Sequence, residues 1–259
     1  MANTFSFVLS TARRRISSIK LLLPESRHKV TDDAASFWSA STDNSRIKDL
    51  SHWLGEGRWS DEKSWLAIGE KHFGMYEKLC LLADRPRPLQ SMVEWGPGGG
   101  ANAVRFCSEI SQLHGVDVSE ANLKKCEQQL ERRGFNGFHP VLIDIHHPEE
   151  ALTAVGSPVE FFIATAVYQH FPGKLYGVKI TKLAYELLND NGIALIQIRY
   201  SDGSKALRPK RNHYAKNAIT FTSYNIAEFW DICFQAGFEP LAISLELSPK
   251  YAYFYLKKR

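Results

Sequence analysis

A chain of 259 residues with 44% hydrophobic residues has enough apolar material for one large α/β domain with an appended cap, which excludes a disordered protein. The formal net charge of +4 is confined to residues 1–24, where three arginines and one lysine occur without any acid, so the remaining sequence is neutral. A nucleic-acid partner requires a stripe of cations on the folded domain, and we therefore expect none here.

The cysteine and histidine patterns contain no metal-binding motif. The four cysteines are scattered without a C-x-x-C pair, and we interpret them as small apolar packing residues in a reducing, cytoplasmic compartment. His146 and His147 are adjacent, so their side chains diverge and do not form a metal-binding pair. No apolar run reaches the roughly 20 residues of a membrane-spanning helix. We therefore expect no metal site and no membrane span.

Two segments precede the first strand of the core. Residues 1–30 form a basic segment with apolar residues at helical spacing, which fits a domain-capping helix, a membrane-surface helix or an organelle-targeting peptide. Residues 31–88 are predicted to form a helical cap or lid with one long amphipathic helix over Glu62–Leu82 and a stiff proline-rich end. The tryptophans of this cap are Trp38, Trp53, Trp59 and Trp65.

The most informative motif is a glycine turn between a strand and a helix. The strand contains Met92 and Val93, the turn runs from Glu94 to Gly100, and a helix begins at Ala101. Glycines let the backbone approach a ligand closely, and the helix start offers unpaired N–H groups with a partial positive charge. Glu94 would repel a pyrophosphate here and attract a cation. The turn therefore predicts a site for a positively charged ligand.

The next two strands each end in an acid. The strand that begins at Leu113 ends at Asp117, which is placed to accept both hydroxyls of a ribose. A helix over about 120–133 follows it. The third strand, 141–143, ends at Asp144, for which capping the next helix is the alternative role.

The second half of the sequence continues the alternation of strands and helices. A strand over 159–163 leads into a loop that contains Tyr168 and His170, and a helix and a strand follow. Residues 200–220 form a polar, basic insertion, for which a solvated loop and a substrate lid are both open interpretations. Two last strands around the turn 248–250 predict an antiparallel hairpin.

In their order and spacing, residues 89–257 resemble the class I S-adenosylmethionine-dependent methyltransferases of the small-molecule type. The turn matches the first motif of that family, E-x-G-x-G-x-G, and the run from Gly115 to Leu123 resembles its second motif. The resemblance implies a Rossmann-like, seven-stranded sheet, mostly parallel with a C-terminal antiparallel hairpin, plus an N-terminal helical cap. It makes residues 89–259 the catalytic domain that binds S-adenosyl-L-methionine.

The resemblance also implies roles for particular residues. His170 is the expected general base, with Tyr168 in reserve, because a hydroxyl acceptor must lose its proton. The loop at 164–167 lacks the polar residue, prolines and aromatic of planar-amine methyltransferases, so we expect a small-molecule acceptor, and the basic insertion suits an anionic one. The implied cofactor-binding residues are Glu94, Gly96, Gly98, Gly100, Asp117, Val118, Asp144, Ile145 and Ala164.

Two other functions remain open at this point. Gly96, Gly98 and Ala101 also satisfy the dinucleotide pattern G-x-G-x-x-[GA], which would indicate an NAD(P)-dependent oxidoreductase. A non-catalytic partner protein that binds S-adenosylmethionine would keep the glycine turn without needing a base. For His170, the alternative is a structural histidine that fixes the loop before Pro172.

Overall fold

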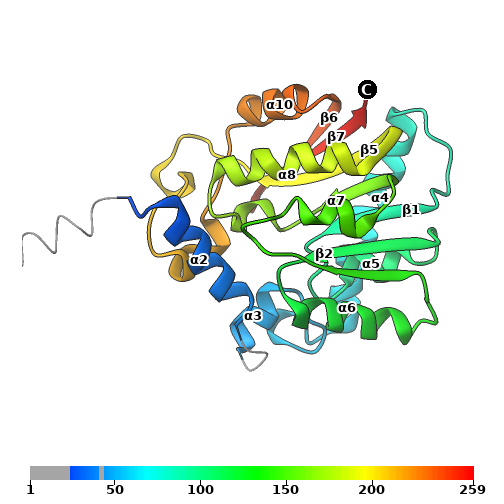
Figure 1. Ribbon diagram of the computed structural model, residues 1–259, viewed down its shortest axis with the longest axis horizontal. Coiled ribbons are helices and arrows are strands. Elements are labelled where there is room, and N and C mark those ends of the chain that lie inside the picture. The colour runs from blue at the N-terminus through cyan, green and yellow to red at the C-terminus, as the bar shows by residue number, and fades with distance from the viewer. Residues whose placement is uncertain (1–23, 41–43) are drawn as a thin grey trace, which may run out of the picture.

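The computed structural model describes residues 24–40 and 44–259, and these ranges fold around one seven-stranded sheet (Figure 1). The strand order is β3-β2-β1-β4-β5-β7-β6, and only the pairings of β7 are antiparallel. The predicted Rossmann-like fold class is confirmed. The strands are β1 (Ser91–Trp95), β2 (Gln112–Asp117), β3 (Phe138–Leu142), β4 (Val159–Ala164), β5 (Leu188–Arg199), β6 (Phe238–Leu247) and β7 (Lys250–Lys258).

The sheet is buried on both faces because its central strands carry consecutive apolar residues. In β5, Ala194 and Ile196 belong to one cluster of buried side chains, and Ile193 and Leu195 belong to the other. Successive side chains of a strand point to opposite faces, so one apolar run supplies both cores. In β1 the same alternation places Glu94 between two core residues, Val93 and Trp95, but on the opposite face from them.

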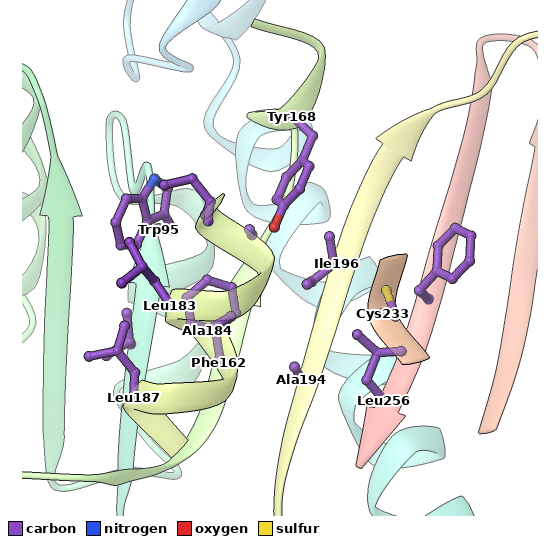
Figure 2. Close-up of a cluster of buried hydrophobic side chains, with 14 of the residues drawn as sticks. Trp95, Phe162, Tyr168, Leu183, Ala184, Leu187, Ala194, Ile196, Cys233 and Leu256 are labelled. Carbon is purple, nitrogen blue, oxygen red and sulfur yellow. The ribbon is translucent and has the colours of Figure 1, made fainter. Parts of the chain in front are cut away.

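Three helices cover the face that carries Trp95. Figure 2 shows Leu183, Ala184 and Leu187 of one of these helices packed over Trp95 and Phe162. Helical residues three and four positions apart lie on one face, which explains why this spacing reaches the sheet. The three helices are α7 (Glu150–Val155), α8 (Lys174–Leu187) and α10 (Ile226–Gln235).

Three other helices cover the opposite face. The longest follows the predicted bounds, begins after the N-cap Asp61 and buries Trp65 and Tyr76 completely. The short helix after the glycine turn packs against both the longest helix and the helix that follows it, and its Asn102 contacts the buried Glu94. These helices are α4 (Glu62–Leu82), α5 (Ala101–Phe106) and α6 (Glu120–Glu131).

The C-terminal hairpin is the one antiparallel part of the sheet. β7 lies between β5 and β6 and pairs with both, for example through Ile196 with Phe254 and Ile243 with Phe254. The second strand of the hairpin, β7, therefore lies next to β5, and the first strand, β6, forms the edge of the sheet. This arrangement confirms the predicted antiparallel end of the sheet.

Two segments far apart in the sequence form a layer beyond the carboxyl ends of the strands. Helix α2 (Arg27–Trp38) and the insertion around α9 (Tyr214–Asn217) lie side by side at this end of the molecule (Figure 1). They share a small apolar cluster, and Trp38 Nε1 donates a hydrogen bond of 2.8 Å to the Tyr214 hydroxyl. A short helix, α3 (Ser45–Leu50), completes the cap.

The cap begins earlier than the sequence predicted. Helix α2 starts at Arg27, inside the segment 1–30 that we had separated from the cap at residue 31. The basic and apolar residues of that segment up to residue 23 lie outside the described residues. Among the described residues, no helix is long and apolar enough to cross a membrane. All four cysteines are free; three are buried and Cys107 is half-buried, as expected for packing residues.

Candidate functional site

The glycine turn lies where the strand order of the sheet reverses. β1 pairs with β2 on one side and with β4 on the other, so the connections after β1 and β4 leave in opposite directions. A crevice opens at such a reversal beyond the carboxyl ends of parallel strands, and ligands bind there in open α/β sheets. The connections that border it are the glycine turn after Trp95 and the loop that begins at Thr165.

The glycines of the turn are required by backbone geometry and by close contacts. Gly96, Gly98 and Gly100 have φ angles of 74°, 54° and 89°, in the left-handed region. A Cβ at Gly98 would lie 2.4 Å from the carbonyl oxygen of Ser51, which also accepts a hydrogen bond of 2.7 Å from Gly99 N. The cap backbone therefore rests directly on the turn.

We expect Gly98→Ala to separate the cap from the turn. The added Cβ meets backbone at Ser51 and requires a strained φ angle, and both effects destabilise the native state by about 1–3 kcal/mol. Chemical unfolding measures this loss, and faster proteolysis within residues 44–61 would localise it to the cap. The control is Gly74→Ala in α4, where an added Cβ would meet nothing within 4 Å, so this variant should be at least as stable as wild type. Equal stability of the two variants would contradict the contact.

Two adjoining pockets form the crevice, one polar and one mainly apolar. The Leu50–Ser51 segment of the cap, Gly96, Gly98 and Ala166 line both of them. The polar pocket is completed by groups from α5, β1 and the loop after β4. The apolar pocket has a volume of about 90 Å³ and is completed by groups from α2, β2 and the loops after β2, β3 and β4.

The polar pocket is built around Asn102, the second residue of α5. Its Nδ2 donates to Glu94 Oε1 at 2.8 Å and to Thr165 Oγ1 at 3.0 Å. Its Oδ1 lies 2.8 Å from His72 Nδ1, and because an amide oxygen only accepts, that histidine nitrogen carries the proton. Asn102 therefore holds the Glu94 carboxylate in one orientation.

Glu94 is the most unusual group of the crevice. Only 2% of the residue is exposed, and Oε2 is buried without a hydrogen-bond partner among the described residues. Burial raises the pKa of its carboxyl to about 8, although the hydrogen bond from Asn102 acts in the opposite direction. A buried acceptor without a partner is costly, so this oxygen is suited to a cationic donor that enters the pocket.

Asp117 lies at the end of β2 and lines the apolar pocket. Its Oδ1 accepts from Ser119 N at 2.9 Å, and its Oδ2 accepts from Asn122 Nδ2 at 3.2 Å. Burial nevertheless raises the pKa of this carboxyl to about 6. Each carboxylate oxygen has a second lone pair, so Asp117 can still accept hydrogen bonds from two hydroxyls.

The structure brings some of the other predicted cofactor residues to the crevice and leaves three outside its lining. Val118 and Ile145 line the apolar pocket with Gly96 and Gly98. Gly100 caps α5 and packs against Cys126, and Ala164 is fully buried in β4. Asp144 is exposed, and its Oδ1 accepts from His146 N at 2.8 Å, so it stabilises its own turn. Thr165 and Ala166, just after Ala164, supply the contact from β4 instead.

His170 lines the apolar pocket and is held by the basic insertion. Its Nδ1 donates a hydrogen bond of 2.7 Å to the carbonyl oxygen of Ala218, so the proton of the neutral ring is on Nδ1 and Nε2 carries the lone pair. Burial lowers the pKa of the imidazole to about 4, while contacts with the backbone of Ala218 and Ala166 raise it. The ring also packs edge-on against Trp38, with centroids 4.9 Å apart. The insertion therefore fixes this histidine as a neutral ring.

Tyr168 is turned away from the crevice. It is completely buried, and its hydroxyl lies 3.0 Å from Thr181 Oγ1 of α8. Figure 2 shows its ring among the buried apolar side chains of the core. Burial raises the pKa of this hydroxyl far above its ordinary value. The single turn of 3₁₀ helix at Tyr168–His170 thus points the two candidate catalytic residues in different directions, and we do not propose a catalytic role for Tyr168.

Several residues of the crevice were not anticipated from the sequence. Asn102 and Thr165 belong to motifs that we recognised, but no spacing rule links an amide on α5 to a hydroxyl after β4. Ser51 comes from the cap, whose path over the turn depends on tertiary packing. Trp38, by contrast, is one of the tryptophans of the predicted cap or lid. A polar residue among apolar ones in the first turn of the helix that follows the glycines is the one signal that could have pointed to Asn102.

Comparisons with known proteins support this fold. No protein-family model matches the chain, and no curated protein matches its sequence. Among solved structures, magnesium protoporphyrin IX methyltransferase (ChlM) from Synechocystis PCC 6803 with bound SAH superimposes with a TM-score of 0.59 at 14% identity, over 89% of this chain and all (100%) of that one. An S-adenosylmethionine-dependent methyltransferase from Clostridium acetobutylicum ATCC 824 superimposes with a TM-score of 0.55 at 12% identity, over 76% of this chain and 92% of that one.

One further neighbour shows that the fold can serve another reaction. The [4+2]-cyclase SpnF superimposes with a TM-score of 0.50 at 13% identity, over 70% of this chain and 80% of that one. The activity of the present chain must therefore be argued from its own site. The sheet order, the crevice at the strand reversal and these superpositions agree on the architecture. The chain has the fold of the class I S-adenosylmethionine-dependent methyltransferases.

Proposed function

We propose that this protein is an S-adenosylmethionine-dependent methyltransferase that acts on the hydroxyl group of a small molecule. The observation that carries the proposal is the buried Oε2 of Glu94 beside the glycine turn, for which residues 24–40 and 44–259 supply no hydrogen-bond partner. Such an oxygen favours a ligand with a cationic donor, and S-adenosylmethionine carries an ammonium group. When bound, this cofactor supplies a methyl group activated by a positively charged sulfur.

The two pockets fit the two halves of this cofactor. Glu94, held by Asn102, suits the ammonium group in the polar pocket. Asp117 suits the ribose hydroxyls in the apolar pocket, where Val118 and Ile145 provide apolar contacts for an adenine ring. The glycine turn allows close approach of the backbone between the two pockets.

The same features disfavour a nicotinamide dinucleotide. Its pyrophosphate would have to lie on the glycine turn, close to Glu94 Oε2 and to the carbonyl oxygen of Ser51. Both of these oxygens would repel a diphosphate. The N–H group of Gly99 could not bind the diphosphate, because it already donates to the Ser51 carbonyl. The NAD(P)-dependent alternative is therefore not the function that this site supports best.

His170 supplies the proton acceptor in the proposed reaction. The hydrogen bond to Ala218 keeps the proton on Nδ1, so the lone pair is on Nε2, which lies 3.4 Å from Gln169 Nε2. An acceptor hydroxyl would replace this long contact and give its proton to Nε2. The insertion that fixes His170 also carries the basic residues beyond β5. We therefore extend the proposal to an acceptor with a carboxylate or phosphate group, which these cations would attract.

We expect Asp117→Ala to weaken the binding of S-adenosylhomocysteine by roughly 100-fold. Two hydroxyls lose a charged acceptor, and at about 1.5 kcal/mol each, the low end for such hydrogen bonds, the loss of about 3 kcal/mol corresponds to this factor. Isothermal titration calorimetry measures the change, with Asp117→Asn expected to be intermediate because an amide oxygen remains. The control is Glu120→Ala, which removes an exposed acid that pairs with Lys124 of the same helix, α6, and this variant should bind as wild type.

Two outcomes of this experiment would overturn the proposed function. The first is that the wild-type protein does not bind S-adenosylhomocysteine at all. The second is that NADH binds in its place, which a fluorescence titration detects. Binding without methyl transfer to any hydroxyl acceptor would favour the non-catalytic alternative.

A further inference from the structure

Three metal-ligating side chains from two separate segments meet on the outer surface of the cap. His28 and Asp32 lie one turn apart on α2, and His146 lies in the loop after β3. Asp32 contacts both histidines, with Oδ2 at 2.8 Å from His28 Nδ1 and Oδ1 at 3.0 Å from His146 Nε2. One candidate ligand atom from each residue lies within 4.8 Å of the others.

We propose that His28, Asp32 and His146 bind a divalent transition-metal ion of the zinc class, with water completing the coordination. Two imidazole nitrogens and one carboxylate oxygen form a ligand set typical of zinc, and three protein ligands with one water make a tetrahedral site. Bond lengths of about 2.0–2.2 Å place such ligand atoms roughly 3.3 Å apart. The two short separations run to different oxygens of Asp32, and rotation of the exposed His28 side chain would bring its nitrogen toward the oxygen that faces His146.

The surrounding charges leave these ligands available. Lys29, which follows His28 on α2, pairs with Asp33 and Glu25. His147 points away from the cluster, with its Nδ1 at 3.5 Å from Glu149. The adjacent histidines therefore diverge as the sequence predicted, and it is His146 alone that joins residues of the cap.

The ion would connect the cap to the core at the edge of the crevice. Helix α2 ends at Trp38, and the loop after β3 contains Ile145, and both side chains line the apolar pocket. A metal bridge from α2 to His146 would thus hold the cap closed over this pocket. This consequence rests on the proposed function, whereas binding of the ion does not.

The test is a titration of the untagged, full-length protein with Co²⁺, which absorbs visible light strongly in a tetrahedral site, followed by displacement with Zn²⁺. We expect wild type to bind one equivalent. His28→Ala and His146→Ala should weaken binding at least about tenfold, as should Asp32→Asn. The matched controls are His147→Ala and Asp33→Asn, which alter the neighbouring residue in each segment and should bind like wild type.

Each variant replaces a residue that is not buried, so all of them should fold. Thermal unfolding in the presence of a chelator checks this, because it compares their stabilities without a bound ion. Absence of saturable Co²⁺ binding to wild type would overturn the proposal and leave a cluster of hydrogen bonds only. Equal binding by wild type, His28→Ala and His146→Ala would overturn it as well, because the ion would then lie elsewhere.

A second measurement separates this inference from the proposed function. If the ion closes the cap, Zn²⁺ should tighten the binding of S-adenosylhomocysteine to wild type by several-fold, and the cofactor should tighten Zn²⁺ binding by the same factor. His146→Ala should abolish this coupling. Co²⁺ binding without any S-adenosylhomocysteine binding would overturn the proposed function and leave the metal site supported.

Discussion

Replacing Glu94 by glutamine is expected to stabilise the free protein and to weaken binding of the proposed cofactor. Burial raises the pKa of this carboxyl to about 8, so the fold disfavours its charged form, and a neutral amide of the same shape should raise the free energy of unfolding by about 1–2 kcal/mol, or roughly 2–8 °C in Tm. The same change removes the charge that attracts an ammonium group, which should cost about 10–100-fold in affinity for S-adenosylhomocysteine. Calorimetry of unfolding and of binding measures the two effects.

The pH dependence of both effects follows from the raised pKa of Glu94. Its carboxyl has a pKa of about 8 in the fold against an ordinary value of 4.5, so its contribution to stability is present below 4.5 and is lost as the pH rises through 8. The stabilisation by Glu94→Gln should therefore be larger at pH 8 than at pH 5. Binding of a cation requires the ionised form, so wild-type affinity should fall between pH 8 and pH 6.5 while the variant stays nearly constant.

The control for this experiment is Glu160→Gln, which alters a carboxylate on β4 that pairs with Arg85 instead of facing the crevice. It should leave cofactor affinity unchanged and give no gain in stability. If Glu94→Gln bound S-adenosylhomocysteine as tightly as wild type, the role of Glu94 in recognising a cation would be wrong. A loss of stability in that variant would show that the carboxylate has a partner in the free protein.

Removing the imidazole of His170 is expected to have the largest effect on turnover. His170→Ala should lower kcat by about 10²–10⁴-fold, because it removes the proposed proton acceptor, while cofactor affinity stays nearly unchanged. The measurement is methyl transfer to a hydroxyl acceptor, once one has been found, together with titration of S-adenosylhomocysteine. His139→Ala, an exposed histidine on β3, is the control and should retain full activity.

The low pKa of His170 predicts a distinctive pH profile. Its imidazole has a pKa of about 4 instead of 6.5, so it stays neutral and able to accept a proton at every pH above about 5. The His170-dependent part of the rate should therefore show no inflection near pH 6.5. Wild-type rates in His170→Ala would retire the base assignment. Tyr168→Phe should remain active, because its hydroxyl is bonded to Thr181 in the core.

The architecture could be predicted from the sequence because each of its signals is local. Apolar runs, glycine turns and helix caps act over a few residues, so the helix Glu62–Leu82, the strand that ends at Asp117 and the final hairpin were all recognisable. The first strand was recognised at Met92 and Val93, but β1 continues through Glu94 and Trp95, which were expected in the turn. The acid at position 94, two residues before the first glycine of the turn, was likewise visible in the local sequence. That residue and Asp117 both line the crevice in the structure.

The site itself depends on contacts between segments that are distant in the sequence. No local rule indicates that Ser51 of the cap lies on Gly99, that Ala218 of the insertion holds His170, or that Asn102 links Glu94 to Thr165. Tyr168 illustrates the limit, since one 3₁₀ turn decides whether a side chain faces the crevice or the core. Asp144 follows the third strand, as predicted, but its carboxylate accepts a hydrogen bond from His146 N within its own turn and does not line the crevice.

The sequence by itself thus determined the order of the elements and the anion beside the glycine turn, because periodicity and turn chemistry act between near neighbours. The tertiary structure alone decided which oxygen of Glu94 lacks a partner within the described part of the chain, which nitrogen of His170 carries the proton, and which of the adjacent histidines 146 and 147 meets Asp32. These outcomes depend on burial and on hydrogen-bond partners supplied across the fold, and neither quantity can be read from residues that adjoin one another in the chain.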